Sequence, residues 1–184
     1  MKEFKSSLIS AQPATKTISF LSLGFLSFAV PFFLGHSQLI TGIVVNMALF
    51  STVILLPANY LLPIALFPSL AVLSLGAVFG PFTPFLIYFL PAIWLGNILL
   101  MMTFKKVYPT SSYGKSIILA STVKSVFLFF FANVFFSFHL VPKLFLQTMG
   151  INQFITAIMG GVLSGFFLKQ VKYESTKQRS GSTL

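Results

Sequence analysis

Long runs of apolar residues alternate with short polar segments along the chain. A helix needs about 20 predominantly apolar residues to cross the hydrocarbon core of a bilayer. Six runs reach or approach that length, at residues 17–34, 39–56, 60–79, 82–104, 115–138 and 153–168. The pattern therefore predicts an all-α fold, a polytopic transmembrane helical bundle of about six spans.

The same pattern predicts a single transmembrane domain, at residues 17–168, between two short polar ends. Residues 1–16 form a cytoplasmic segment whose lysines precede an apolar run, as in a secretory signal. That run is longer than a typical signal core and ends without a small-x-small cleavage site, so we expect an uncleaved first span. Residues 169–184 are polar, basic and rich in small residues, which predicts a disordered cytoplasmic tail.

Composition supports a lipid-facing surface. Only 8% of the residues are charged and 56% are hydrophobic, with a mean hydropathy of +0.94. A soluble domain carries roughly 25% charged residues because its surface must face water. The lipid bilayer is therefore the expected surrounding of most of the chain, and six spans leave no length for an additional soluble domain.

The net charge of +10 is distributed unevenly over the predicted loops. Six spans place most basic residues on one side, namely Lys105, Lys106, Lys115, Lys169, Lys172, Lys177 and Arg179. The loops of the other side carry only Lys143. Because basic loops stay in the cytoplasm, this asymmetry predicts a multi-pass protein of the cell inner membrane with both termini cytoplasmic. Because membrane topology accounts for the positive charge, the charge does not indicate a nucleic-acid partner.

Prolines and glycines interrupt the middle of the chain. They are Pro57, Pro63, Pro68, Pro81, Pro84 and Pro91, interleaved with Gly76 and Gly80. Proline inside a helix removes a backbone hydrogen bond, and in hydrocarbon the freed carbonyl must find another donor. We expect broken helices here, either as two kinked spans or with a re-entrant piece near residues 68–84.

Lys124 is the most unusual residue of the chain, because it lies roughly 13 Å beyond Lys115 along the predicted fifth span. The only acids are Glu3 and Glu174, both in the terminal segments, so no carboxylate in the membrane can neutralise it. The side chain can snorkel toward the headgroups. It can instead face a polar cavity and meet an anionic or carbonyl-bearing ligand, with Ser121 near it on the same face.

Amide side chains form a second polar group. Gln38, Gly42 and Asn46 share one face of the second span, and Asn97 lies deep in the fourth. Hydrogen bonds between helices would satisfy them, at about 0.6 to 2 kcal/mol each. Convergence of Asn46, Asn97 and Lys124 on one cavity would favour a ligand site instead. The candidate substrate-binding residues are Lys124, Asn46, Asn97, Gln38 and Ser121.

Small residues follow one stripe of the sixth span. Ala157, Gly161 and Gly165 share a face, and beside them lie Thr156, Gly160 and Ser164. Small residues four positions apart allow helix backbones to approach closely. The stripe predicts tight packing, against a helix of this chain or of another subunit.

Motifs of catalysis are missing from the sequence. It contains no cysteine, no phosphate-binding loop, no His-Glu-x-x-His and no Gly-x-Ser-x-Gly. Two well-separated histidines cannot supply a metal site by themselves. We therefore expect no enzyme activity, no metal and no cofactor.

The segment at residues 68–81, PSLAVLSLGAVFGP, followed by Leu95-Gly96-Asn97, resembles the third and fourth spans of energy-coupling-factor (ECF) transporter S components. These are six-span substrate-binding subunits of vitamin and micronutrient importers. Asn97 stands where an acidic residue is frequent in that family, and the first span lacks the Ala-x-x-x-Ala pair that docks the coupling partner. The resemblance implies a substrate cavity near the outer face, a transmembrane coupling protein and ATPase subunits.

Two functions from different classes follow. The first is a membrane-embedded substrate-binding subunit of a small-molecule importer, which a polar ligand cavity would favour. The alternative is a non-transporting scaffold or assembly protein that binds partners through its small-residue faces. A passive channel would need a polar stripe through several spans, which the sequence does not contain.

Overall fold

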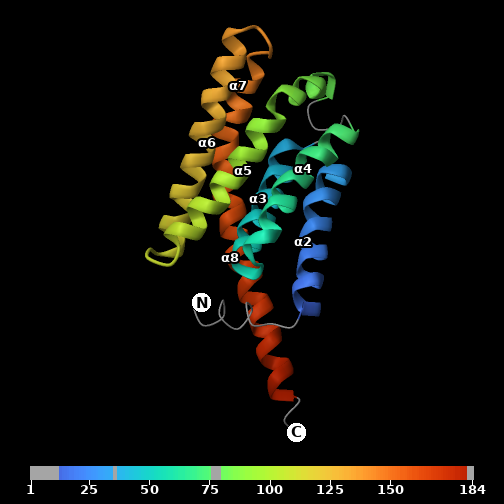
Figure 1. The fold of residues 1–184 in the computed structure, drawn as a ribbon, viewed down its shortest axis with the longest axis vertical. Coiled ribbons are helices and arrows are strands. Elements are labelled where there is room, and N and C mark those ends of the chain that lie inside the picture. The colour runs from blue at the N-terminus through green and yellow to red at the C-terminus, as the bar shows by residue number, and fades with distance from the viewer. Residues whose placement is uncertain (1–12, 35–36, 76–79, 182–184) are drawn as a thin grey trace.

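The computed structural model describes residues 13–34, 37–75 and 80–181, and this part of the chain is helical without any β-strand. The helices are α2 (Pro13–Leu34), α3 (Gln38–Leu55), η1 (Ala58–Tyr60), α4 (Leu61–Leu75), η2 (Gly80–Phe85), α5 (Leu86–Val107), α6 (Tyr113–Ser137), α7 (Leu144–Met149) and α8 (Ile151–Gly181). The long helices run up and down through one elongated bundle (Figure 1). The predicted all-α bundle is confirmed.

Four stretches of this bundle are long and apolar enough to cross a membrane: Gln38–Leu55, Leu86–Val107, Tyr113–Ser137 and Leu144–Tyr173. Two shorter apolar helical stretches, Lys16–Pro31 and Ala58–Leu73, lie beside them in the same bundle. Large apolar side chains such as Phe25, Phe130 and Phe166 are exposed on the outside of the bundle. Such a surface is stable only in lipid, so the chain is a membrane protein.

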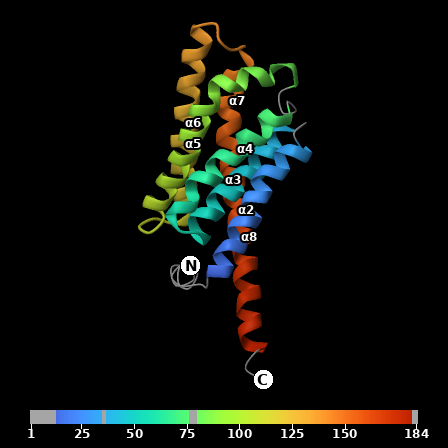
Figure 2. The same ribbon diagram turned by 45° about the vertical axis from the view of Figure 1, so that its right-hand side comes forward.

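Helix α3 is the centre of the bundle. It lies among α2, α4, α5 and α8 and contacts each of them (Figure 2). Of its residues 61% are buried, against 39% in the corresponding windows of α5 and α6. Ser37 caps its first turn by accepting a hydrogen bond from the Ile40 N–H. Pro57 follows its last residue closely and opens the short helix η1, because proline fits the start of a helix but not its interior.

The proline-rich middle forms short pieces as well as helices. Helix α4 continues through Pro68, and the 3-10 helix η2, which contains Pro84, leads directly into α5. Part of the predicted re-entrant piece falls on residues 76–79, which lie outside the described residues. The described residues on either side contain the expected interruption, a change from α-helix to 3-10 helix before the next long helix.

Two predictions about the end of the chain were wrong. The tail was expected to be disordered from Lys169 onward, but α8 continues to Gly181. Lys, Gln, Glu and Arg in this segment are good helix formers, and no proline or glycine occurs in it before Gly181. The second difference is α7, a short helix in a predicted loop, whose Phe145 and Met149 are buried because they cover one end of the apolar core.

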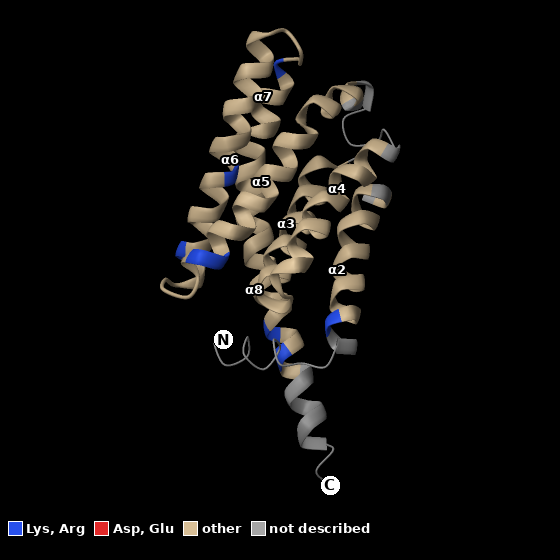
Figure 3. Cartoon of the chain, in the orientation of Figure 1, with Lys and Arg blue, Asp and Glu red and all other residues tan. Residues whose placement is uncertain are grey.

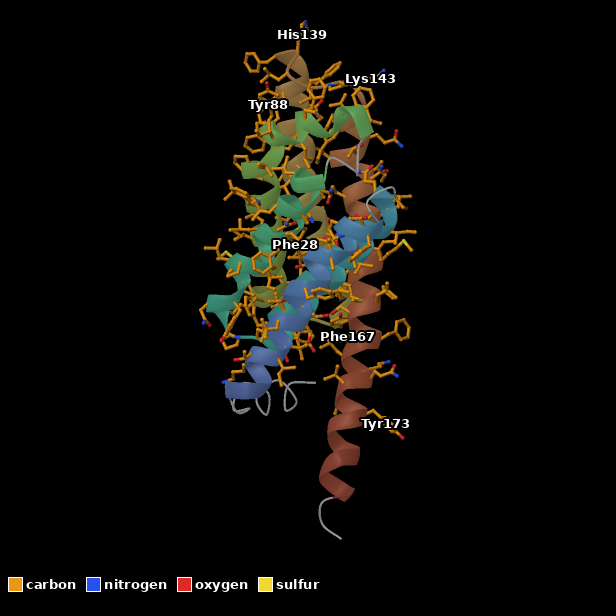
Figure 4. All side chains as sticks on the ribbon, turned by 90° about the vertical axis from the view of Figure 1, so that its right-hand side faces the viewer. Phe28, Tyr88, His139, Lys143, Phe167 and Tyr173 are labelled. Carbon is orange, nitrogen blue, oxygen red and sulfur yellow. The ribbon has the colours of Figure 1, made fainter. Side chains whose placement is uncertain are left out.

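Basic side chains gather at one end of the bundle, where α2 begins, α5 is followed by α6, and α8 leaves the other helices (Figure 3). They are Lys16, Lys105, Lys106, Lys115, Lys169 and Lys172. Lys143 and His139 lie at the opposite end from Tyr173 (Figure 4). The separation of charge that was read from the sequence is therefore present in the three-dimensional arrangement.

The small residues of α8 contact two different helices of the same chain. A Cβ on Gly160 would lie 2.6 Å from the Ile43 carbonyl oxygen of α3. A Cβ on Gly161 would lie 2.7 Å from Ile117 of α6, and one on Gly165 would lie 2.9 Å from Tyr113. Ala157 is completely buried in the core between them. This stripe therefore packs within the chain, which answers the question that the sequence left open.

Candidate binding cavity

Lys124 points into the bundle from the middle of α6. The buried stripe of this helix includes Ala120 and Leu128, one turn before and one turn after Lys124, so the helical period places the lysine inward. Only 3% of the lysine is exposed, and its Nζ donates a hydrogen bond to Asn46 Oδ1 at 2.8 Å. An ammonium group that is bonded to an interior amide does not snorkel to the headgroups.

Asn46 continues this polar contact into a third helix. Its Nδ2 donates to the Gly42 carbonyl oxygen at 2.8 Å and to Thr156 Oγ1 of α8 at 3.3 Å. The Thr156 hydroxyl in turn donates to the Asn152 carbonyl oxygen at 2.8 Å. The side chains of Lys124, Asn46 and Thr156 thus link α6, α3 and α8 through groups that are buried away from water.

Close helix packing makes this linkage possible. Gly42 lacks a side chain where a Cβ would lie 3.0 Å from Thr156, and Gly160 lets α8 approach the backbone of α3 one turn further along. On the other side of the site, a Cβ on Gly96 would lie 3.2 Å from Leu128, so α5 and α6 also approach closely. These contacts fix the distances between the polar side chains, because larger residues would separate the helices.

A cavity of about 90 Å³ lies beside Lys124. Four of the five predicted binding residues line it, namely Lys124, Asn46, Asn97 and Gln38. The remaining wall consists of Pro31, Thr41, Gly42, Val45, Pro68, Ser69, Val72, Leu86, Ile93, Met149 and Gln153. Lys124, Asn46 and Asn97 therefore converge on one cavity.

Ser121, the fifth predicted residue, does not line this cavity. Its side chain is completely buried, and its hydroxyl oxygen has no hydrogen-bond partner among the described residues. Three residues turn an α-helix by about 300°, which is about 60° short of a full turn. Ser121 and Lys124 therefore share the buried side of α6 but point in different directions.

Asn97 holds another wall of the cavity in place. It is 2% exposed, and its Nδ2 donates to the Ala65 carbonyl oxygen of α4 at 2.9 Å. One turn earlier on α5, Trp94 Nε1 donates to Ser69 Oγ of α4 at 2.6 Å. Sequence reasoning missed Trp94 and Ser69, although a tryptophan three residues before a buried amide on one helix face was a usable signal.

The cavity occupies the half of the bundle away from the basic end. Gln38 is the first residue of α3, Leu86 is the first of α5, and Gln153 lies in the first turn of α8. All three of these helix starts lie at the end opposite the lysine-rich connections (Figures 1 and 3). Lys124 and Asn46 come from the middles of their helices and therefore form the inner limit of the cavity.

The lining of the cavity combines polar groups with an apolar wall. The described lining residues offer an ammonium, side-chain amides and hydroxyl groups on an otherwise apolar wall, and none of them carries a carboxylate. Within the described residues, no group of three or more His, Cys, Asp or Glu could hold a metal ion. Polar groups on an apolar wall are the usual composition of a small-molecule site.

Comparisons with protein-family models, with curated proteins and with solved structures gave no match for this chain. The likeness to ECF S components therefore rests on the residues at 68–81 and on Leu95-Gly96-Asn97.

Proposed function

We propose that this membrane protein is a substrate-binding subunit of a small-molecule importer, and that the cavity beside Lys124 is its solute site. The observation that carries the proposal is the position of Lys124, a lysine 3% exposed in an apolar bundle, at the wall of a cavity that Asn46, Asn97 and Gln38 also line. Ionisable groups deep in membrane helices usually serve binding or transport, because they are costly there.

The orientation that fits this function follows the positive-inside rule. The lysine-rich end lies in the cytoplasm, and the cavity lies in the half of the bundle nearer the outside of the cell inner membrane. The sequence has no nucleotide-binding motif, so uptake driven by ATP would require partner proteins. The resemblance to S components suggests a transmembrane coupling protein with ATPase subunits in that role.

The scaffold function has one observation in its favour. Asn46, Asn97 and Thr156 each donate to a partner within the chain, as amides and hydroxyls that only hold helices together would. However, the small-residue stripe on which such a scaffold would depend is already occupied by α3 and α6. The solute site is therefore the better supported function.

The proposal is tested with a thermal-unfolding screen of small solutes on the protein purified in an uncharged detergent. A solute that binds the folded state raises the unfolding midpoint. Val72→Phe should abolish this rise by filling the cavity, because Val72 lines it without making a polar contact. Val126→Phe adds the same volume to an exposed face of α6 and should retain the rise.

A scaffold would behave differently in the same screen. No solute would raise the midpoint of the unmodified protein, and Val72→Phe would leave recovery of its complexes from the membrane unchanged. That combination of results would contradict the proposed solute site.

A further inference from the structure

We infer that the solute taken by this cavity is a small oxyanion, such as a short carboxylate or nitrate. The inference rests on the proposed function and narrows its substrate class. Two properties of the site carry it, namely the balance of charge in the lining and the volume of the cavity.

With Lys124 protonated, the charge of the lining is positive and uncompensated. Among the described residues that line the cavity, Lys124 is the only charged one and none is an acid. The two acids of the chain, Glu3 and Glu174, belong to its terminal segments. A cationic solute would be repelled, and a neutral one would leave the ammonium charge unbalanced, whereas an anion neutralises it inside the membrane.

The hydrogen bonds of Lys124 leave room for such a ligand. A lysine ammonium has three N–H donors. In the described part of the chain, the only hydrogen bond of Lys124 Nζ is the one to Asn46 Oδ1. Two donors therefore remain for oxygen atoms of a ligand, and the amides of Gln38 and Gln153 on the wall can supply further N–H groups.

The contact with Asn46 also orients the lysine. The Asn46 side chain is itself held by Gly42 and Thr156, so its Oδ1 atom is a fixed acceptor for the ammonium. The lysine is thus kept at the cavity wall before a ligand arrives, which lowers the entropy lost on binding.

The volume limits the size of the anion. A cavity of about 90 Å³ is smaller than the roughly 300–1,000 Å³ of sites for drug-sized ligands. The cavity therefore favours a solute that is smaller than a drug-sized ligand. Formate, acetate and nitrate are small oxyanions of that kind.

The test measures the unfolding midpoint of the full-length protein with sodium formate, acetate and nitrate. Sodium gluconate at equal ionic strength serves as a bulky anion, and acetamide serves as a neutral molecule shaped like acetate. The small oxyanions should raise the midpoint, and gluconate and acetamide should not. Acetate and nitrate together show whether the site prefers organic or inorganic oxyanions.

Two variants assign the effect to the cavity. Lys124→Gln should weaken anion binding at least about 30-fold, because it removes the charge from one side of a buried charge pair. Lys115→Gln removes an exposed lysine from the same helix and should bind as the unmodified protein does. If Lys124→Gln does not fold, the ratio of midpoint shifts for acetate and acetamide in the unmodified protein still decides the inference.

Each outcome has a definite meaning. Anion binding that is lost in Lys124→Gln and kept in Lys115→Gln supports the inference. Equal or tighter binding of acetamide, abolished by Val72→Phe, would overturn the choice of an anion and leave the solute-binding function standing. No response to any of these solutes would overturn both.

Discussion

Gly160 of α8 lies so close to Ile43 of α3 that a Cβ on the glycine would be 2.6 Å from the Ile43 carbonyl oxygen. Two other atoms of α3, the Asn46 Cβ and the Met47 backbone nitrogen, would lie at 2.7 Å. Backbone atoms cannot move aside as a side chain does, so this contact determines how closely α3 and α8 pack. The polar contact between Asn46 and Thr156 depends on it.

Gly160→Ala should therefore destabilise the bundle by about 1–3 kcal/mol, the usual cost of overpacking. Gly114→Ala is the control, because a new Cβ at this helical glycine of α6 would meet no atom within 4 Å. Unfolding of both variants in a denaturing detergent, compared with the unmodified protein, measures the difference. An effect of Gly114→Ala equal to or larger than that of Gly160→Ala would contradict the close contact assigned to Gly160.

His139 holds a left-handed backbone conformation at the end of α6, with a φ of 57°. The His139 N–H donates to the Phe136 carbonyl and the Leu140 N–H to the Phe135 carbonyl, which is the Schellman arrangement that usually contains glycine. His139→Gly should stabilise the protein by about 1 kcal/mol, because glycine adopts this conformation without steric cost.

Ser137→Gly is the control for this change. Ser137 is the last residue of α6, where glycine has no advantage and should lower stability by up to about 1 kcal/mol. The measurement is the unfolding midpoint of both variants. A lower midpoint for His139→Gly would mean that the histidine contributes more through its side chain than it costs through its backbone.

The sequence predicted the helices of the bundle because the length of an apolar run depends only on local composition. It also identified Lys124 and Asn46 as costly groups in a membrane, which follows from residue type and position alone. It did not predict that these two would bond to each other across 78 positions. That pairing depends on which helices become neighbours, and small residues such as Gly160 determine this through contacts that no local pattern records.

Trp94 and Thr156 were missed for the same physical reason. Each has a bonding partner on another helix, Ser69 for the tryptophan and Asn46 for the threonine. In the sequence, Trp94 is one more apolar residue of a span and Thr156 one more small residue of a stripe. Only the packing of α4 against α5 and of α3 against α8 brings them to Ser69 and Asn46, which line the cavity.

Membrane topology can be tested without removing any native cysteine, because the sequence contains none. We expect Lys143→Cys to react with a membrane-impermeant maleimide in intact cells, since the positive-inside rule places its end outside. Lys115→Cys and Tyr173→Cys should react only after the cells are permeabilised. Labelling of Tyr173→Cys in intact cells would show that the C-terminal end of α8 is outside and would reverse the orientation.

The contact between Lys124 and Asn46 predicts that removing Asn46 lowers stability more than removing Lys124 does. Asn46→Ala removes the one acceptor of the ammonium in the described residues and leaves the charge buried, which should cost about 3–5 kcal/mol. Lys124→Met removes the charge itself and keeps a long apolar stem. It should cost at most about 1–3 kcal/mol, the penalty for leaving the Asn46 oxygen without a donor.

The double variant Lys124→Met with Asn46→Ala should be more stable than Asn46→Ala alone, because the charge that the asparagine satisfied is gone. Unfolding free energies of the four proteins form a double-mutant cycle whose coupling energy isolates this contact from the rest of the packing. Ser51 and Ser164, which bond to each other between α3 and α8 at 2.9 Å, provide a neutral reference cycle. A coupling for Lys124 and Asn46 no larger than for the two serines would mean that the ammonium does not depend on Asn46 and lies elsewhere in the bilayer.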